Sequence, residues 1–323
     1  MIKLEENGNK NTNFFSNFKN SCFNANIEEL LKNENVGENV DENVGENVGE
    51  NVDIDENEIF SNTVPDTIFI IPYRDRKEHL YFFNIYMKHI LEEWSNNSYE
   101  IYFAHQVDNR PFNRGAMKNL GFLAIKDKYP NDYHNITFIF HDVDTIPYKK
   151  NLLSYKTTQN HINHFYGFKF ALGGIFAIKG CDFEKINGFP NIWGWGLEDN
   201  EIQNRALNNG MIIDRNEFFE SGSKSILQFI DGIKKTIINR QRPVDIYNDY
   251  KNDGINTLKN INYDIVIDNN INIGKFINIT NFNSLLKHSD EKYELYDVVK
   301  NKGKIYSKTP LAGSMKSILS FRR

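Results

Sequence analysis

The sequence predicts an α/β fold with a mainly parallel sheet, because strand-like and helix-like segments alternate along residues 67–144. The strand-like segments are short runs of β-branched and aromatic residues. The segments between them repeat apolar residues at intervals of three and four, which is typical of an amphipathic helix. Strands joined through such helices form right-handed parallel units, and these bind ligands at the carboxyl ends of their strands.

The first predicted strand, TIFIIPYR, is a buried run that ends near Pro72. In the helix predicted after it, Leu80, Phe83, Met87, Ile90 and Trp94 share one face. The predicted elements, in order, are strand 67–74, helix 77–94, strand 99–107, helix 113–129, strand 135–144 and a later helix over 198–210.

Three regions are predicted along the chain. Residues 1–62 form a largely disordered low-complexity region, in which residues 34–52 repeat Glu-Asn-Val-Gly/Asp; one small apolar residue in four cannot offset the entropy of ordering. Residues 27–33, IEELLKN, are expected to form one short helix there. One folded domain is expected over residues 63–269. A C-terminal extension follows over residues 270–323, and its helix-like end docks on the domain or binds a partner.

The composition limits the classes of function. Hydrophobic residues make up 40% of the 323, enough to build a core. A net charge of −5 and a pI near 5.9 argue against a general nucleic-acid partner, which requires a basic surface. Cys22 and Cys181 are not expected to form a disulfide, which favours the cytoplasm or another reducing compartment. The sequence shows no signal peptide pattern and no apolar run long enough for a transmembrane anchor.

Charged motifs follow each of the first three predicted strands: PYRDR at 72–76, NRPFNR at 109–114 and HDVD at 141–144. Arginine forks bind phosphate oxygens, and paired carboxylates suit a hard divalent cation that itself contacts phosphates. Together these motifs predict a cradle for a diphosphate. The alternatives are surface ion pairs for the arginines and a simple acidic turn for the aspartates. No Gly-x-Gly-x-x-Gly or P-loop pattern is present.

Two further segments suggest a ligand site. Gly173 and Gly174 interrupt a strand-like run, which indicates either close approach by a ligand or a bulge. In PNIWGWGLEDNEIQNR, residues 190–205, the acids of the predicted helix start complement the helix dipole. That role leaves Trp195 unexplained. A tryptophan face beside carboxylates is suited to a sugar ring, so a sugar acceptor is predicted here.

These motifs together resemble the β-1,4-galactosyltransferase family, inverting glycosyltransferases with a GT-A fold. The resemblance covers residues 67–265 and is carried, in the family's order, by IIPYRDRKEHL, FNRGAMKNLGF, FIFHDVDTIP, LGGIFAIKGCDFEKINGFPNIWGWGLEDNEIQNR and, more weakly, NDGINTLKNINYDI. It implies a Rossmann-like, mainly parallel sheet flanked by helices, and it implies that residues 63–269 are a catalytic domain.

The resemblance also implies roles for particular residues. Asp199 is the general base, and Trp195, Glu198 and Asp199 bind the acceptor sugar. Asp144 ligates a Mn²⁺ ion that bridges the phosphates. The residues implied to hold the UDP-sugar are Pro72, Tyr73, Arg74, Arg76, Phe112, Asn113, Arg114, Asp142, Val143, Asp144, Gly173, Gly174 and Trp195.

Three features depart from the family pattern. The family usually completes its metal site with a histidine near the position of Phe229, but no histidine occurs between His164 and His288; Asp231 is the substitute considered. Ala171 stands where vertebrate galactosyltransferases carry a tyrosine that limits the C2 substituent of the donor, so an N-acetyl group is admitted. The membrane anchor and disulfides of secreted members are not seen.

The leading hypothesis is therefore an inverting enzyme that transfers galactose or a related hexose from a UDP-sugar to a hydroxyl of a glycan or glycoconjugate acceptor. The alternative enzyme is an N-acetylgalactosaminyl- or glucosyltransferase, suggested by Ala171. From another class, a non-catalytic protein that binds UDP-sugar or glycan stays open because of the missing histidine.

Overall fold

The computed structural model describes residues 63–194, 196–229, 251–268, 273–285 and 287–288, and the backbone of two further strands, β10 (Lys234–Ile238) and β13 (Tyr293–Asp297). The predicted low-complexity region, with its short helix, lies outside the described residues, as do Asp231 and most of the predicted C-terminal extension.

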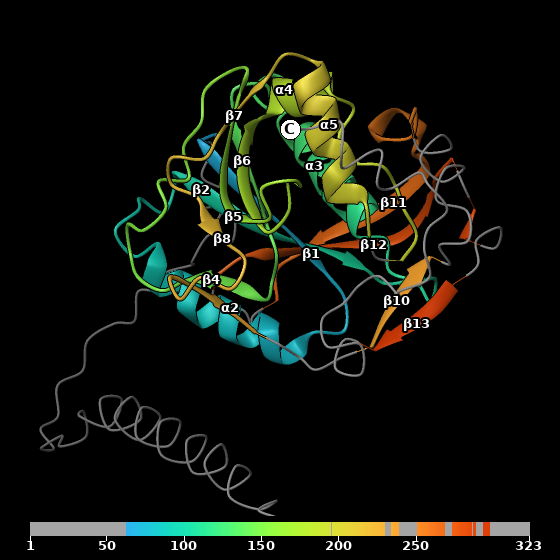
Figure 1. Ribbon diagram of the computed structural model, residues 1–323, viewed down its shortest axis with the longest axis horizontal. Helices are drawn as coiled ribbons and strands as arrows, with labels where there is room; N and C mark the ends of the chain where they lie inside the picture. Colours follow the sequence, from blue (N-terminus) through green and yellow to red (C-terminus); the bar gives the residue numbers. More distant parts are fainter. Residues whose placement is uncertain are drawn as a thin grey trace, which may run out of the picture. The chain divides into compact units, whose positions relative to one another are not determined.

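The three predicted strands form the centre of one sheet (Figure 1). Strand β1 (Thr67–Tyr73) lies between β2 (Tyr99–Gln106) and β3 (Thr137–His141) and runs parallel to both. Every residue of β1 and β3 is buried, as expected for strands with both faces covered. The predicted parallel arrangement is confirmed for these strands.

Further strands extend the sheet on both sides of this centre. Its order is β11-β12-β2-β1-β3-β6-β5-β7, with β8 paired to β5. Strand β6 is antiparallel to both β3 and β5, and β11 is antiparallel to β12, while the remaining pairs are parallel. The added strands are β5 (His161–Gly167), β6 (Ile175–Lys179), β7 (Ile212–Asp214), β8 (Phe219–Glu220), β11 (Lys259–Val266) and β12 (Lys275–Asn283).

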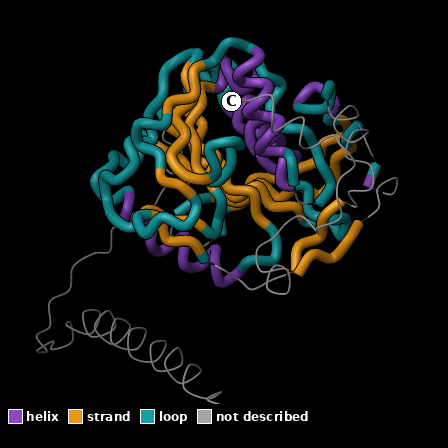
Figure 2. The backbone as a smooth tube through the Cα atoms, in the orientation of Figure 1, coloured by secondary structure: helices purple, strands orange, loops and turns teal. Residues whose placement is uncertain are grey.

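Helices cover the two faces of the sheet (Figure 2). Helix α2 (Lys77–Ile90) packs on one face with Phe69 and Ile71 of β1. Helix α3 (Arg114–Lys128) packs on the other face with Ile68 and Ile70. Alternate residues of β1 thus enter two separate cores, as the pleat of a strand requires.

The helix boundaries lie within two residues of the predictions, except at the end of α2. Helix α5 (Glu198–Asn208) begins at the predicted residue. Helix α2 ends at Ile90, before Trp94, which packs as a half-buried side chain against the core beyond the helix. The remaining elements are α4 (Gly180–Lys185), a 3₁₀ turn at Ile255–Thr257, and β4 (Thr145–Pro147), which pairs with β9 (Ile226–Gln228).

The predicted C-terminal extension contributes to this sheet. Strand β12 lies within residues 270–323 and pairs in parallel with β2, and Ile277 and Ile279 are fully buried in the core. The predicted division of the chain into three regions is otherwise untested. Among the described helices, none combines the length and the apolar character that crossing a membrane requires.

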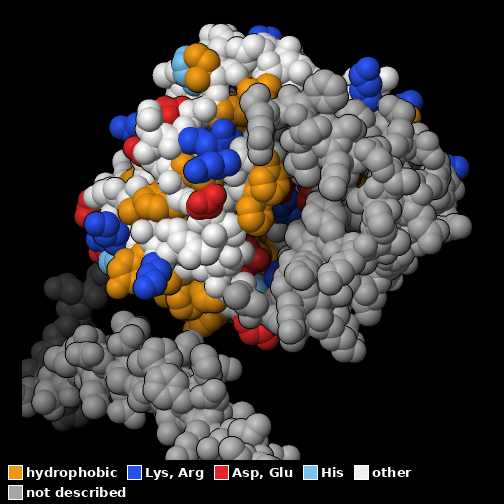
Figure 3. Space-filling view, viewed as in Figure 1, with side chains coloured by type: hydrophobic (Ala, Val, Ile, Leu, Met, Phe, Trp, Pro, Cys, Tyr) orange, Lys and Arg blue, Asp and Glu red, His pale blue; other side chains and the backbone are white. Residues whose placement is uncertain are grey.

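The face of the molecule seen in Figure 3 mixes side chains of different kinds over its described part. Basic, acidic and hydrophobic groups alternate there, so this described surface presents no field of a single sign.

Candidate functional site

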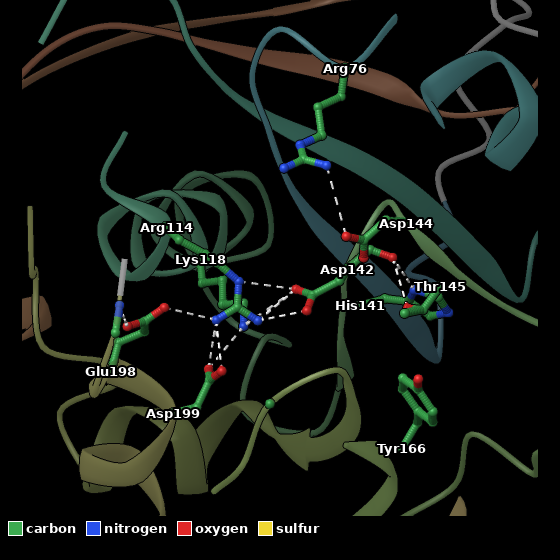
Figure 4. Close-up of polar contacts among 12 residues, drawn as sticks. Arg76, Arg114, Lys118, His141, Asp142, Asp144, Thr145, Tyr166, Glu198 and Asp199 are labelled. Atoms are coloured by element: carbon green, nitrogen blue, oxygen red, sulfur yellow. Dashed lines mark hydrogen bonds and ion pairs between the residues drawn. The ribbon is translucent and has the colours of Figure 1, made fainter. Parts of the chain in front are cut away.

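The predicted site residues meet at one edge of the sheet, where the parallel strands β1 and β3 end (Figure 4). Their side chains come from the loop after β1, the start of α3, the loop after β3 and the start of α5. These segments are distant in sequence, and the parallel topology brings them together.

Arg114, the first residue of α3, joins three carboxylates. Its Nε and Nη2 donate to the Asp142 carboxylate at 2.7–3.1 Å. Its Nη1 donates to both carboxylate oxygens of Asp199 at 2.8 Å and to Oε1 of Glu198 at 3.0 Å. The Arg114 side chain is only 11% exposed. All three guanidinium nitrogens thus donate to acids; the diphosphate contact that the family resemblance implies for Arg114 stays a prediction.

Asn113 fixes the start of α3 and so the position of Arg114. Its side-chain oxygen accepts a hydrogen bond from Ala116 N at 2.9 Å, which caps the helix. Its amide group donates to Asn191 O at 3.0 Å, and its backbone N–H donates to Gln106 Oε1 at 2.8 Å. Because Asn113 is fully buried, its structural role here is to orient Arg114.

The segment before α5 is tied to the segment before α3. Gly194 N donates to Phe112 O at 3.0 Å, next to a parallel bridge between Asn113 and Gly194. Trp195 follows directly but lies outside the described residues, so its implied contacts with donor and acceptor stay predictions.

The start of α5 presents two acids in different environments. Glu198 is buried and accepts hydrogen bonds from Gly196 N at 3.0 Å and from Arg114. The Asp199 side chain is 24% exposed and faces the space between α3 and the loop after β3. Of the two, Asp199 is therefore the carboxylate that an acceptor hydroxyl reaches more easily.

The glycine pair adjoins the same cluster. Leu172 N donates to Asp199 O at 2.8 Å, and a Cβ placed on Gly173 would collide with the Asp199 carboxylate. Gly174 has a φ of +70°, and its carbonyl accepts from Asp142 N at 3.1 Å. The Asp199 side chain thus needs the space beside Gly173, while the close approach of a ligand predicted for the glycine pair stays a prediction.

Lys118 is a member of this cluster that sequence reasoning missed. Its side chain is fully buried, and its Nζ lies 3.6 Å from Asp199 Oδ1 and 3.9 Å from Asp142 Oδ1. The only available signal was its spacing of four residues from Arg114, which places both on one face of α3. We refer to Arg114, Lys118, Asp142, Glu198 and Asp199 as the Arg114 cluster.

The carboxylates of the cluster differ in their acidity. Burial opposes ionisation of Asp142, but the charges of Arg114 and Lys118 outweigh it and hold its pKa below the ordinary value. Burial and the neighbouring Asp199 charge together raise the pKa of Glu198. The pKa values of two acids that Arg114 binds thus shift in opposite directions. Such shifts are common in functional sites.

A second group surrounds Asp144, the predicted metal ligand. Its carboxylate lies 3.9 Å from Arg76 Nη1, and its backbone oxygen accepts from Phe229 N at 2.8 Å. Phe229, at the position where the family usually has histidine, stacks on His79 of α2 with ring centroids 5.6 Å apart. Within the described part of the chain, no group of three or more His, Cys, Asp or Glu residues is placed to hold a metal ion. Asp231 lies outside that part.

The other predicted donor residues line the same edge. Pro72 and Tyr73 end β1, and the Tyr73 ring is buried. The Arg74 guanidinium is partly exposed and donates to the Arg110 carbonyl. Val143 is buried between the two aspartates of its motif. Of this group, Arg74 offers a charged side chain to a ligand.

Models of a known family match the chain. The N-terminal region of glycosyl transferase group 7 matches residues 42–157, and the N-terminal domain of galactosyltransferase matches residues 154–226. β-1,4-Galactosyltransferase 1 of Mus musculus is 39% identical over 156 residues, which are 45% of this chain and 38% of that protein. β-1,4-Galactosyltransferase 5 of Sus scrofa is 34% identical over 171 residues, 49% of this chain and 42% of that protein. The chain thus spans about two fifths of the length of these curated relatives.

Solved structures show the same fold. The catalytic domain of Drosophila β1,4-galactosyltransferase 7 in complex with xylobiose superposes with a TM-score of 0.55 at 23% identity, covering 76% of this chain and all of that one. A mutant of the same Drosophila enzyme in complex with manganese, UDP-Gal and xylobiose gives a TM-score of 0.51 at 22% identity, covering 74% of this chain and 98% of that one.

Proposed function

Because the chain belongs to the glycosyltransferase group 7 family, we propose that it is an inverting hexosyltransferase that moves galactose from UDP-galactose to a sugar hydroxyl. The observation that carries this proposal is the Arg114 cluster, in which one arginine holds the three acids Asp142, Glu198 and Asp199 at the ligand-binding edge of a parallel sheet.

In the proposed reaction, Asp199 is the general base. It takes the proton of the acceptor hydroxyl while that oxygen attacks the anomeric carbon of the donor. A new glycosidic C–O bond forms, the bond from the anomeric carbon to the phosphate oxygen breaks, and UDP leaves with the bonding electron pair. Arg114 holds Asp199 in place through two hydrogen bonds of 2.8 Å, which supports a fixed direction for proton transfer.

The charge of the leaving diphosphate requires cations on the opposite side of the donor. Arg114 is occupied by carboxylates, so we assign this task to Arg74 and Arg76, which follow β1 and are partly exposed. Asp144 lies beside Arg76, and manganese bound there would neutralise phosphate oxygens. The described residues supply Asp144 alone among the predicted metal ligands, so no step is derived through the ion.

A second candidate differs only in the donor. Ala171 is a small, buried residue two positions before Gly173, and its size favours a donor with an N-acetyl group at C2, as in an N-acetylgalactosaminyltransferase. A glucosyltransferase is the further alternative. A protein that binds UDP-sugar or glycan without transfer is the alternative from another class, suggested by Phe229 at the histidine position.

A donor screen tests the proposal. The full chain is incubated with UDP-galactose, UDP-N-acetylgalactosamine or UDP-glucose and with sugar acceptors, among them xylobiose, and UDP release is measured with manganese and with a chelator. Acceptor-dependent UDP release with UDP-galactose as the preferred donor supports the proposal. Release with another preferred donor supports the second candidate, and calorimetric binding of UDP-sugar without release supports the binding protein.

A further inference from the structure

Lys118 is a buried cation that forms ion pairs but no hydrogen bond within the described part of the chain. Among the described residues its ammonium has no hydrogen-bond partner, and its side chain is fully buried. Its Nζ lies over the Phe189 ring, 4.5 Å from the centroid. A buried ammonium without hydrogen bonds is costly for a fold, and burial, together with the Arg114 charge, lowers the pKa of Lys118. A methionine of similar length would pack there without that cost.

The carboxylates nearby explain why a cation is kept at this place. Asp199 Oδ1 and Asp142 Oδ1 lie 3.6 Å and 3.9 Å from Nζ. Arg114 and Lys118 are thus the two cations that lie within 4 Å of both aspartates. Without Lys118, one guanidinium alone would face both of these partly buried carboxylates, and the cluster would bind a proton more readily.

We propose that Lys118 is a positioning residue for the transfer reaction: its buried ammonium is the second cation that holds the Asp199 carboxylate by charge and directs it toward the acceptor. This inference rests on the proposed function, in which Asp199 is the base. Arg114 binds Asp199 through hydrogen bonds, and the ammonium of Lys118, one turn further along α3, lies 3.6 Å from the same carboxylate. The charged or titratable groups that face Asp199 from the packed elements are Arg114 and Lys118 of α3, Asp142 after β3, Glu198 of α5 and His164 of β5.

The first experiment does not depend on activity. Urea unfolding is measured for the wild type, Lys118→Met, Asp199→Asn and the double variant. If Lys118 is the counter-ion of Asp199, the change in the free energy of unfolding caused by Lys118→Met should be more favourable in the Asp199→Asn background than in the wild type. The coupling should be on the order of tenfold in the unfolding equilibrium constant. Independent effects of the two changes would overturn the proposal. Lys126→Met, on the same helix but paired with Glu184, is the matched control and should act independently of Asp199→Asn.

The second experiment measures the pH profile of transfer at saturating donor. Removing a cation favours protonation of a nearby carboxylate, so Lys118→Met should lose activity on the acid side and regain it as the pH rises. The acid limb should move upward by about one pH unit or more. Lys118→Arg keeps the charge and should leave the limb close to that of the wild type, and Lys126→Met should not move it. An equal loss at every pH would show a merely structural role and overturn the proposal.

The two experiments separate the failure of this inference from the failure of the proposed function. A wild type that transfers no sugar from any donor refutes the proposed enzymatic function. The double-mutant cycle measured by urea unfolding then decides alone whether Lys118 and Asp199 are coupled.

Discussion

The two ends of helix α3 hold buried charges in different ways. At its C-terminal end, Lys128 and Lys275 donate to Glu100 Oε1 at 2.9 Å and 2.7 Å, while Tyr102 and Tyr129 donate to Oε2 at 2.8 Å and 2.9 Å. At its N-terminal end, three carboxylates share the single guanidinium of Arg114, and the ammonium of Lys118 has no hydrogen bond within the described part of the chain.

The difference separates a structural cluster from the one that carries the proposed function. Around Glu100, both carboxylate oxygens accept hydrogen bonds and two lysines lie close. Burial raises the Glu100 pKa, but the two lysines outweigh this effect and lower it to about 2. This group ties α3 to β2 and β12. In the Arg114 cluster, by contrast, three carboxylates share one guanidinium and a lysine without hydrogen bonds at the ligand-binding edge of the sheet. Such a costly arrangement of charges is common at functional sites.

The largest expected effect is at the functional end. Asp199→Asn keeps the shape of the side chain and removes its basicity, so transfer should slow by about 10² to 10⁴, the usual contribution of a positioned general base. That range corresponds to roughly 3 to 5 kcal/mol of barrier. Steady-state rates at saturating donor, with calorimetry of UDP, provide the test. UDP affinity should persist, because Arg74 and Arg76 lie on another loop. A rate close to that of the wild type would return Asp199 to the role of a helix-dipole partner.

The next prediction concerns Asp144, outside the Arg114 cluster. Asp144→Ala should reduce the rate of manganese-stimulated transfer by about tenfold to a hundredfold or more. The fold should stay intact, because the partly exposed Asp144 carboxylate contributes little to the core. Rates are compared across a manganese titration, with circular dichroism as the control for folding. A wild type that ignores both manganese and chelators would remove the metal from the proposal.

At the structural end of α3 the expected effect is on stability. Glu100→Gln leaves Lys128 and Lys275 without their carboxylate and should reduce the free energy of unfolding by about 1 to 3 kcal/mol, with transfer rates unchanged. The folded pKa of Glu100 lies below its ordinary value of 4.5, so its stabilising effect is full above about pH 4.5 and is lost as the pH falls toward 2.

Urea unfolding between pH 2 and pH 7 checks this prediction, and Glu100→Gln should flatten the acid part of the wild-type curve. A slower transfer rate in this variant at neutral pH would contradict the assignment of a purely structural role to the Glu100 end of α3.

The last expected effect is on donor choice. Ala171→Tyr adds a ring beside the position expected for the C2 substituent, so it should reduce the use of UDP-N-acetylgalactosamine more than that of UDP-galactose, by about 10- to 200-fold in the ratio of kcat/KM. Competition between the two donors measures that ratio directly. Equal losses with both donors would show that Ala171 does not shape the donor pocket.

The fold class, and the edge of the sheet where the candidate site lies, were predictable from the sequence alone. Hydrophobic periodicity reports local backbone geometry, so β1, β2, β3 and the helices between them were predictable within a few residues. Parallel connectivity then placed the motifs after β1 and β3 at one edge. The run from Pro190 to Arg205 also predicted the start of α5 and its two site acids.

Only the tertiary structure decided which charges meet. Arg114 binds Asp142 and Asp199, which lie 28 and 85 residues further along the chain, and periodicity does not report such distant pairs. In the sequence, Lys118 has the pattern of an ordinary polar residue of a helix. In the structure, packing buries it fully beside Asp142 and Asp199. Strand β12 pairs with β2 although it lies beyond the predicted end of the domain. Local patterns did not predict this pairing because it joins segments that are distant in the sequence. Local patterns set backbone conformation, whereas long-range packing selects the partners of each charge.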